Sequence, residues 1–134
     1  MVDSGAATHV GNDERMFSVK GPSNTSVSLP NSKLIRAASE GIMTLRNTGS
    51  DGFSFELRDS LLVPEFKVSL LSVPKATDKG AKVVFTKDSV EIVDASGAIT
   101  LRGYRSGDLY YIDYDYMQSS VALADTTFVN SANL

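Results

Sequence analysis

The sequence predicts a mostly β fold with one short helix. Short apolar runs alternate with polar residues at a period of two, and clusters of Gly, Asn, Asp and Ser separate these runs. With 134 residues, 42% hydrophobic and 22% charged, the chain has the size and composition of one globular domain. No apolar run approaches the roughly eighteen residues of a membrane helix, so we expect no membrane role.

The first half of the chain contains two predicted hairpins and one further strand. Turn-forming residues at 30–32 separate the strands of the first hairpin, and the segment 47–52 separates those of the second. Pro64 ends the further strand. The predicted strands are 25–29, 33–37, 41–46, 53–57 and 61–63.

The second half begins with the one predicted helix, at 73–80, where Pro74 lies near the start and Gly80 follows the end. Four strands joined by short turns follow, at 82–86, 89–93, 98–102 and 109–113. We expect a folded domain at 1–116. Residues 117–134 are rich in Ser, Ala, Thr and Asn, and we expect a flexible tail or a linker toward a downstream domain.

Charge and composition exclude several classes of function. The 13 Lys and Arg residues against 16 Asp and Glu residues give a net charge of -3, which does not favour binding to nucleic acid. The chain has no cysteine and a single histidine, His9, so neither a disulfide scaffold nor a multi-histidine metal site can form. We expect no cofactor and no metal, and we expect any catalysis to rest on carboxylates, since a Ser-His scheme would have to use His9.

The residues Asp3-Ser4-Gly5-Ala6 form the clearest candidate for chemistry. A carboxylate at a strand end, followed by a small hydroxyl residue and a glycine, suits a turn whose backbone holds the carboxylate through hydrogen bonds. The alternative is an ordinary surface turn.

The segment around this turn resembles the D-S-G-A-x-x-H opening of the aspartic proteases of Ty1/copia-type retrotransposons. It reads VDSGAATH at 2–9. Further segments resemble the family in the same order, over about residues 2–113: a hairpin at 28–32, VPEFKVSLLSV at 63–73, the short helix that ends at 78–80, KVVF at 82–85 and GDLYYID at 107–113. An unrelated β-sandwich binding module would require all these matches to be coincidental.

The resemblance implies a retropepsin-like closed β domain with a C-terminal β-hairpin extension, active as a homodimer. Each subunit would supply one catalytic Asp3, because Asp59, Asp88 and Asp125 lack the glycine of the motif. Two carboxylates held close together share one proton, so that one Asp3 acts as acid and the other as base on an attacking water. Neither a metal nor a cofactor takes part in this reaction.

The resemblance also implies the other site residues. The hairpin turn would be a flap that closes over substrate, formed by Leu29, Pro30, Asn31, Ser32 and Lys33. Leu70, Leu71 and Ser72 would support the active-site turn from below, and the Ser4 hydroxyl would help to lock the two turns across the dimer axis. We expect His9 to be a hydrogen-bonded structural residue and not a base.

The implied substrate is a polypeptide, the element's own Gag-Pol polyprotein, cleaved in the cytoplasm within virus-like particles. Only Met1 and Val2 precede Asp3, where the family has an apolar strand that helps to join the subunits, so the hairpins at 89–113 could supply interface strands instead. The alternative function is a non-catalytic retropepsin-like domain that acts as a structural or interaction module between the protease and integrase regions. Asp3→Asn separates the two, because only a protease loses an activity.

Overall fold

A computed structural model of the chain describes residues 1–29, 31–47, 54–116, 127–129 and 131–132. The described residues form a mostly β structure with one short α-helix, as the sequence predicts. They contain no helix with the length and apolar character of a membrane span.

The elements follow one another with few long connections. In chain order they are β1 (Val2–Asp3), β2 (Val10–Gly11), the 3-10 helix η1 (Glu14–Met16), β3 (Phe17–Gly21), β4 (Ser26–Ser28), β5 (Leu34–Arg36), β6 (Ser39–Asn47), β7 (Ser54–Leu62), β8 (Leu71–Ser72), α1 (Val73–Asp78), β9 (Lys82–Phe85), β10 (Ser89–Val93), β11 (Ile99–Ser106), β12 (Leu109–Tyr116), β13 (Thr127–Val129) and β14 (Ser131–Ala132).

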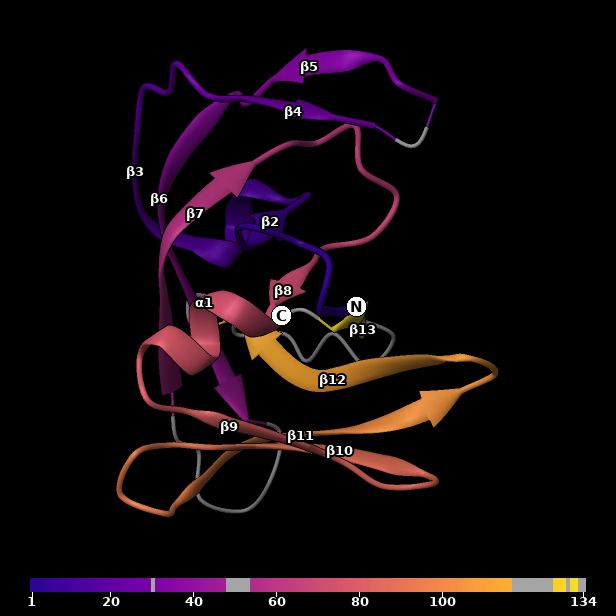
Figure 1. The fold of residues 1–134 in the computed structure, drawn as a ribbon. Helices are drawn as coiled ribbons and strands as arrows, with labels where there is room; N and C mark the ends of the chain where they lie inside the picture. The colour runs from indigo at the N-terminus through magenta and orange to yellow at the C-terminus, as the bar shows by residue number, and fades with distance from the viewer. Residues whose placement is uncertain (30, 48–53, 117–126, 130, 133–134) are drawn as a thin grey trace.

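Most strands belong to one continuous hydrogen-bonded path, β2-β7-β6-β12-β11-β10-β9, with β3 paired to β6 and β13 paired to β12. Two smaller sheets lie beside it: the parallel set β14-β1-β8 and the hairpin β4-β5. Figure 1 shows the β4-β5 hairpin at one end of the molecule and strands β9 to β12 at the other, with α1 between these ends.

The closed β domain implied by the resemblance is not found among the described strands. The path ends at β2 and β9, which do not pair with each other in this part of the chain. The reason lies in β12, which changes partner along its length: Tyr114 to Tyr116 pair with β6, whereas Leu109 to Ile112 pair with β11. The chain therefore continues into a four-stranded antiparallel sheet, β9 to β12, in place of the predicted simple hairpin extension.

The predicted hairpins are confirmed. In the first, the Leu29 N–H donates to the Lys33 carbonyl at 2.8 Å, and the Ser32 N–H donates to the Leu29 carbonyl at 2.9 Å. Ser32 has a φ of 65°, a left-handed conformation that a tight turn requires. Pro30 of this turn and residues 48–53 of the second turn lie outside the described residues.

The predicted helix is confirmed as α1. The Ser72 hydroxyl accepts a hydrogen bond from the Lys75 N–H at 3.2 Å and so caps the first turn, and Pro74 occupies a position where no helical N–H is needed. Gly80 follows with a φ of 90°. The four strands predicted after the helix correspond to β9, β10, β11 and β12.

The predicted tail is only partly described, because residues 117–126, 130 and 133–134 lie outside the described residues. Within it, β13 pairs antiparallel with β12, and β14 pairs parallel with β1. The division into a domain at 1–116 and a tail at 117–134 stays a prediction.

Strand β3 is absent from the sequence-based prediction. It pairs antiparallel with β6, yet only Phe17 at its start is buried, while Ser18, Val19 and Lys20 are exposed. An alternating pattern arises only where one face of a strand packs on a core. Because β3 has little such contact, it leaves no periodic signal in the sequence.

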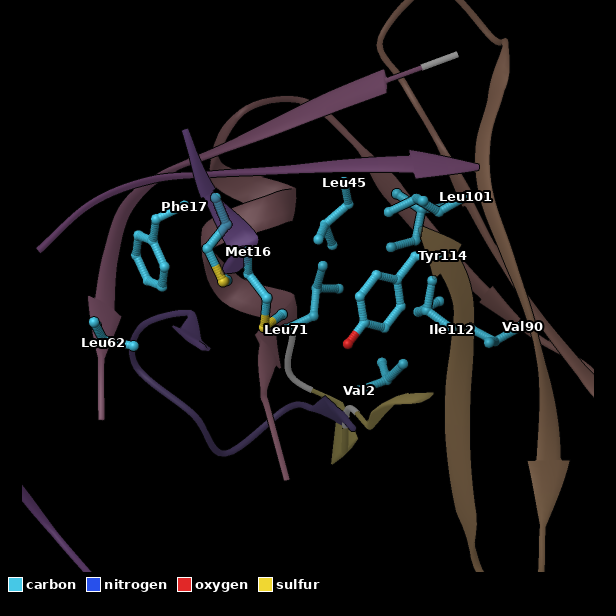
Figure 2. Packing of buried hydrophobic residues seen from close by; sticks show 12 residues of the cluster. Val2, Met16, Phe17, Leu45, Leu62, Leu71, Val90, Leu101, Ile112 and Tyr114 are labelled. Carbon is cyan, nitrogen blue, oxygen red and sulfur yellow. The ribbon is translucent and has the colours of Figure 1, made fainter. Parts of the chain in front are cut away.

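One hydrophobic cluster joins the two ends of the molecule. It combines side chains from β1, β8, η1, β3, the long strands β6 and β7, and the C-terminal sheet, as Figure 2 shows. Its buried members are Val2, Met16, Phe17, Met43, Leu45, Leu62, Leu71, Val90, Ile92, Leu101, Ile112 and Tyr114. The C-terminal sheet is thus packed on the same core as the strand that carries Asp3.

A second, smaller cluster lies under the β4-β5 hairpin. Val10, Ala37, Leu61 and Val63 are buried in it, and partly buried Val27 and Ile35 of the hairpin pack against it. These contacts attach the base of the hairpin to the body of the domain, while the turn extends beyond them.

Gly103 shows how closely the strands of the C-terminal sheet approach. A Cβ atom at this position would overlap the carbonyl oxygen of Tyr111 on the neighbouring strand β12. The pairing of β11 with β12 therefore requires a residue without a side chain here.

We expect Gly103→Ala to lower the free energy of unfolding by about 2–3 kcal/mol, because backbone atoms must shift to admit the methyl group. Gly21→Ala is the matched control, since a Cβ at Gly21 meets nothing within 4 Å. Its effect should stay within about 0.5 kcal/mol. Urea unfolding followed by circular dichroism measures both, and equal stability of the two variants would contradict the close approach.

Candidate active site

Asp3 lies at the end of β1, between two parallel neighbours. β1 aligns Val2 with Leu71 and Asp3 with Ser72 of β8, and β14 flanks its other edge. Val2 is buried in the main cluster, which fixes the strand, whereas Asp3 is only partly buried. The carboxylate is therefore carried on an anchored strand and remains open to the surface.

The turn after β1 holds the carboxylate in place. The Gly5 N–H donates to Asp3 Oδ1 at 2.9 Å, and the Ala6 N–H donates to the Asp3 carbonyl at 3.3 Å. A Cβ at Gly5 would lie 3.3 Å from Asp3 Oδ1, which is tighter than ordinary contact. Glycine thus lets the backbone approach its own carboxylate, as the Asp-Ser-Gly spacing predicts.

Ser72 supports this turn from the neighbouring strand. It is fully buried, and its hydroxyl donates to the Ala6 carbonyl at 2.6 Å. Leu71 is buried in the core beside Val2, and Leu70 forms a bridge with Val10. The structure therefore places Leu71 and Ser72 next to the Asp3 strand and its turn, and Leu70 against β2, although the contribution of these residues to any activity stays a prediction.

His9 is buried and accepts a hydrogen bond. The Ser72 N–H donates to its Nδ1 at 2.9 Å, which requires a neutral ring. Burial, and to a smaller degree the nearby Lys75 ammonium, lowers the pKa of His9 from 6.5 to about 3. This geometry agrees with the expected structural role and ties the segment after the Asp3 turn to the start of α1.

A cleft of about 890 Å³ opens above Asp3. Asp3 and Gly5 line it on one side, and Val27, Ser28, Leu29 and Asn31 of the first hairpin line it on another. A third wall comes from the segment 65–68 together with Leu70. The predicted catalytic carboxylate and part of the predicted flap therefore face the same hollow.

Of the remaining predicted flap residues, Ser32 and Lys33 lie in the turn, and Pro30 is outside the described residues. Lys33 pairs with Leu29 across the turn, and its N–H also donates to Asn31 Oδ1 at 3.0 Å. Ser4, whose hydroxyl was expected to bond across a dimer axis, is exposed beside Asp3. The contact of Ser4 with a second copy of the chain stays a prediction.

Sequence reasoning missed the residues that hold the third wall of the cleft. The Asn12 side-chain amide donates to the Phe66 carbonyl at 3.0 Å, and its Oδ1 accepts a hydrogen bond from the buried Ser69 hydroxyl at 3.0 Å. The Ser69 hydroxyl in turn accepts from the Asn12 N–H at 3.0 Å. Asn12 and Ser69 are far apart in sequence, so their contact could not be predicted. Only Ser69 lies in a segment, 63–73, that resembles the protease family.

The depressed pKa of His9 makes stability depend on pH. The folded state keeps His9 neutral down to about pH 3, whereas the unfolded chain takes up the proton at about 6.5. The unfolded state therefore binds more protons in this window, and stability falls as pH falls from 6.5 toward 3, by about 1.4 kcal/mol per pH unit from this group.

His9→Asn provides the matched variant, because the shorter amide can offer an oxygen to the Ser72 N–H but does not titrate. Urea unfolding at pH 7.5, 6.5, 5.5 and 4.5 should show a steeper loss of stability for the wild type. Between pH 6.5 and 4.5 the wild type should lose about 2.3 kcal/mol more than the variant. Parallel stability curves for the two proteins would show that the pKa of His9 is the same in the folded and unfolded states, which contradicts this prediction.

Comparison with known proteins identifies the family. Residues 1–81 match the family of the Pol polyprotein beta-barrel domain, and the match covers the Asp3 turn, the first hairpin, β8 and α1. Searches among curated proteins and among solved structures found no match. Because the family match spans more than half of the 134 residues, this chain belongs to the family of Pol polyprotein beta-barrel domains.

Proposed function

We propose that this domain is the aspartic endopeptidase of a retroelement Pol polyprotein. The observation that carries the proposal is the position of the Asp3 carboxylate, oriented by the Gly5 N–H and facing a cleft that the β4-β5 hairpin also lines. A carboxylate held by backbone donors at a concave surface is a suitable proton acceptor for a water molecule.

The proposed active form is a homodimer. The sequence holds a single Asp-Ser-Gly, so one chain supplies one carboxylate of the pair that the reaction needs. A two-fold axis beside the exposed Ser4 would bring two Asp3 turns together, because an isologous contact places the same residues on both sides. Two such carboxylates share one proton, since both cannot stay ionised at close range.

The reaction then divides between the two subunits. The ionised Asp3 takes a proton from water as the water oxygen attacks the peptide carbonyl carbon. The protonated Asp3 of the other subunit donates a hydrogen bond to the developing oxyanion. When the tetrahedral intermediate collapses, the C–N bond breaks and the leaving nitrogen takes up a proton from the carboxyl pair.

The hairpin is suited to cover a bound peptide. Val27 and Ile35 attach its base to the small cluster, while Leu29 and Asn31 face the cleft. Closure over an extended substrate would exclude water from the scissile bond. The proposed substrate is the element's own Gag-Pol polyprotein, cleaved in the cytoplasm within virus-like particles.

A second candidate is a non-catalytic structural or interaction module of the polyprotein. The family description favours it directly, because that description names a β-barrel domain of Pol and no activity. In this case the cleft above Asp3 would have a binding or purely structural role, and the carboxylate itself would be dispensable.

The deciding experiment combines light scattering over a concentration series with cleavage of a Gag-Pol fragment that spans the domain's own junctions. We expect a concentration-dependent dimer that cleaves the fragment, and loss of cleavage by about 10³-fold or more in Asp3→Asn with fold and assembly retained. Asp88→Asn is the matched control, since Asp88 is exposed, precedes a serine and lies outside the cleft.

A dimer that never cleaves, or equal cleavage by Asp3→Asn and the wild type, would contradict the peptidase and favour the module. If the chain is a monomer and does not cleave, the assay is repeated with upstream residues of the polyprotein added to restore the dimer. Failure of the longer chain to cleave then contradicts the proposal.

The shared proton also predicts the pH dependence of cleavage. Activity requires one ionised and one protonated Asp3, so kcat/KM should follow a bell-shaped profile centred below neutrality. Initial rates between about pH 4 and 8 test this, with circular dichroism at each pH to confirm folding. A flat profile over this range is incompatible with a carboxyl pair.

A further inference from the structure

A second cavity, of about 380 Å³, lies between α1, β7 and the C-terminal sheet. Its apolar lining comes from Phe55 and Leu57 of β7, Leu71 of β8, Ile92 of β10 and Leu101 of β11. The volume lies within the range of small-molecule sites. This cavity shares no lining residue with the cleft above Asp3.

His9 supplies a buried hydrogen-bond donor at this cavity. Its Nδ1 accepts from the Ser72 N–H, so the proton of the neutral ring is on Nε2. His9 lines the cavity, and because Nδ1 is occupied by the Ser72 N–H, Nε2 is the ring nitrogen left to contact a ligand. Within the described part of the chain, no hydrogen bond is assigned to Nε2, so this buried N–H has an unused donor function.

The charged residues around the cavity leave an excess of positive charge. Arg58 and Glu56 pair with each other at 2.8 Å. Asp94 is directed to its own turn, where it accepts hydrogen bonds from the N–H groups of Ser96 and Ala98 and from the Ser96 hydroxyl. Arg58 and Glu56 therefore cancel, whereas Asp94 keeps its negative charge but directs it to its own turn. The lining as a whole holds three cations, Arg58, Lys75 and Lys79, against these two carboxylates.

The two lysines of the α1 region are different. The Lys75 ammonium donates to the Asp59 carbonyl at 3.2 Å and lies 3.9 Å from its exposed carboxylate, which leaves further donor capacity. Lys79 lines the cavity and forms no ion pair with any residue that the structure describes. Together with the His9 Nε2–H, these groups suit an acceptor that carries a negative charge.

We propose that this cavity binds a small molecule with an apolar body and a single carboxylate. The apolar body would lie against Leu57, Leu71 and Leu101, and the carboxylate would accept from His9 Nε2–H and the ammonium groups of Lys75 and Lys79. The proposal does not depend on the peptidase function, because it concerns a separate cavity and binding alone.

Binding at this cavity would affect the Asp3 turn. His9 connects the two sites, since the nitrogen opposite the ligand accepts from the Ser72 N–H, and Ser72 aligns with Asp3 in the parallel pair. A hydrogen bond at Nε2 makes Nδ1 a better acceptor, because bonds in a chain polarise one another. The Ser72 amide proton therefore serves as a local reporter of occupancy.

The test is a titration of the full 134-residue chain with octanoate at pH 7. Calorimetry and amide NMR spectra measure the binding. We expect a Kd of about 1 mM or tighter and a downfield shift of the Ser72 amide proton. Octan-1-ol, with the same chain length and no charge, should bind about fivefold more weakly or worse.

Two variants test where the octanoate carboxylate binds, and a third controls for the loss of one positive charge. Lys79→Gln should weaken octanoate binding about fivefold and His9→Asn about tenfold. Lys87→Gln removes the same charge from an exposed position outside the cavity and should leave the Kd unchanged. Lys79 is exposed, so its substitution keeps the test valid even if His9→Asn alters the fold.

The proposal is overturned if octanoate at about 10 mM produces no heat and no shift at Ser72. It is also overturned if octan-1-ol binds as tightly as octanoate, because the cavity is then merely apolar. Equal weakening by Lys79→Gln and Lys87→Gln would attribute the effect to net charge and contradict a specific site.

Discussion

The parallel pairing of β1 with β8 is the contact on which the position of Asp3 depends. Each strand has only two residues, and two such short strands have no stability of their own in water. Burial of Val2 and Leu71 in the main cluster holds the pair, and Ser72 reinforces it through bonds to Ala6 and His9. Because these residues are distant in sequence, the carboxylate is placed only when the whole domain has folded.

Features that depend on residues close together in the sequence could be predicted. The turn residues around Asn31 and Gly80 set the first hairpin and the end of α1, and the short spacing of Asp3 and Gly5 set the hydrogen bond that orients the carboxylate. Each of these features depends on residues within a few positions of one another. Strand β3 escaped prediction because its exposed residues lack an apolar alternation.

Features that depend on distant partners could not be predicted in the same way. The open path of strands follows from β12, whose two halves pair with β6 and β11, and no sequence pattern in Leu109–Tyr116 marks that change of partner. The burial and hydrogen bond of His9 agree with the structural residue that the sequence led us to expect. Its partner Ser72, its depressed pKa and the cavity beside it required the folded chain.

The sharing of β12 between two sheets also bears on where the domain ends. The family match stops at residue 81, yet Leu101, Ile112 and Tyr114 beyond it pack in the same cluster as Val2 and Leu71. A fragment that stopped there would expose the apolar face behind the Asp3 strand to water and leave the edge of β6 unpaired. The boundary of sequence similarity is thus not a boundary of cooperative unfolding, and substitutions in the C-terminal sheet can disturb the Asp3 turn without touching it.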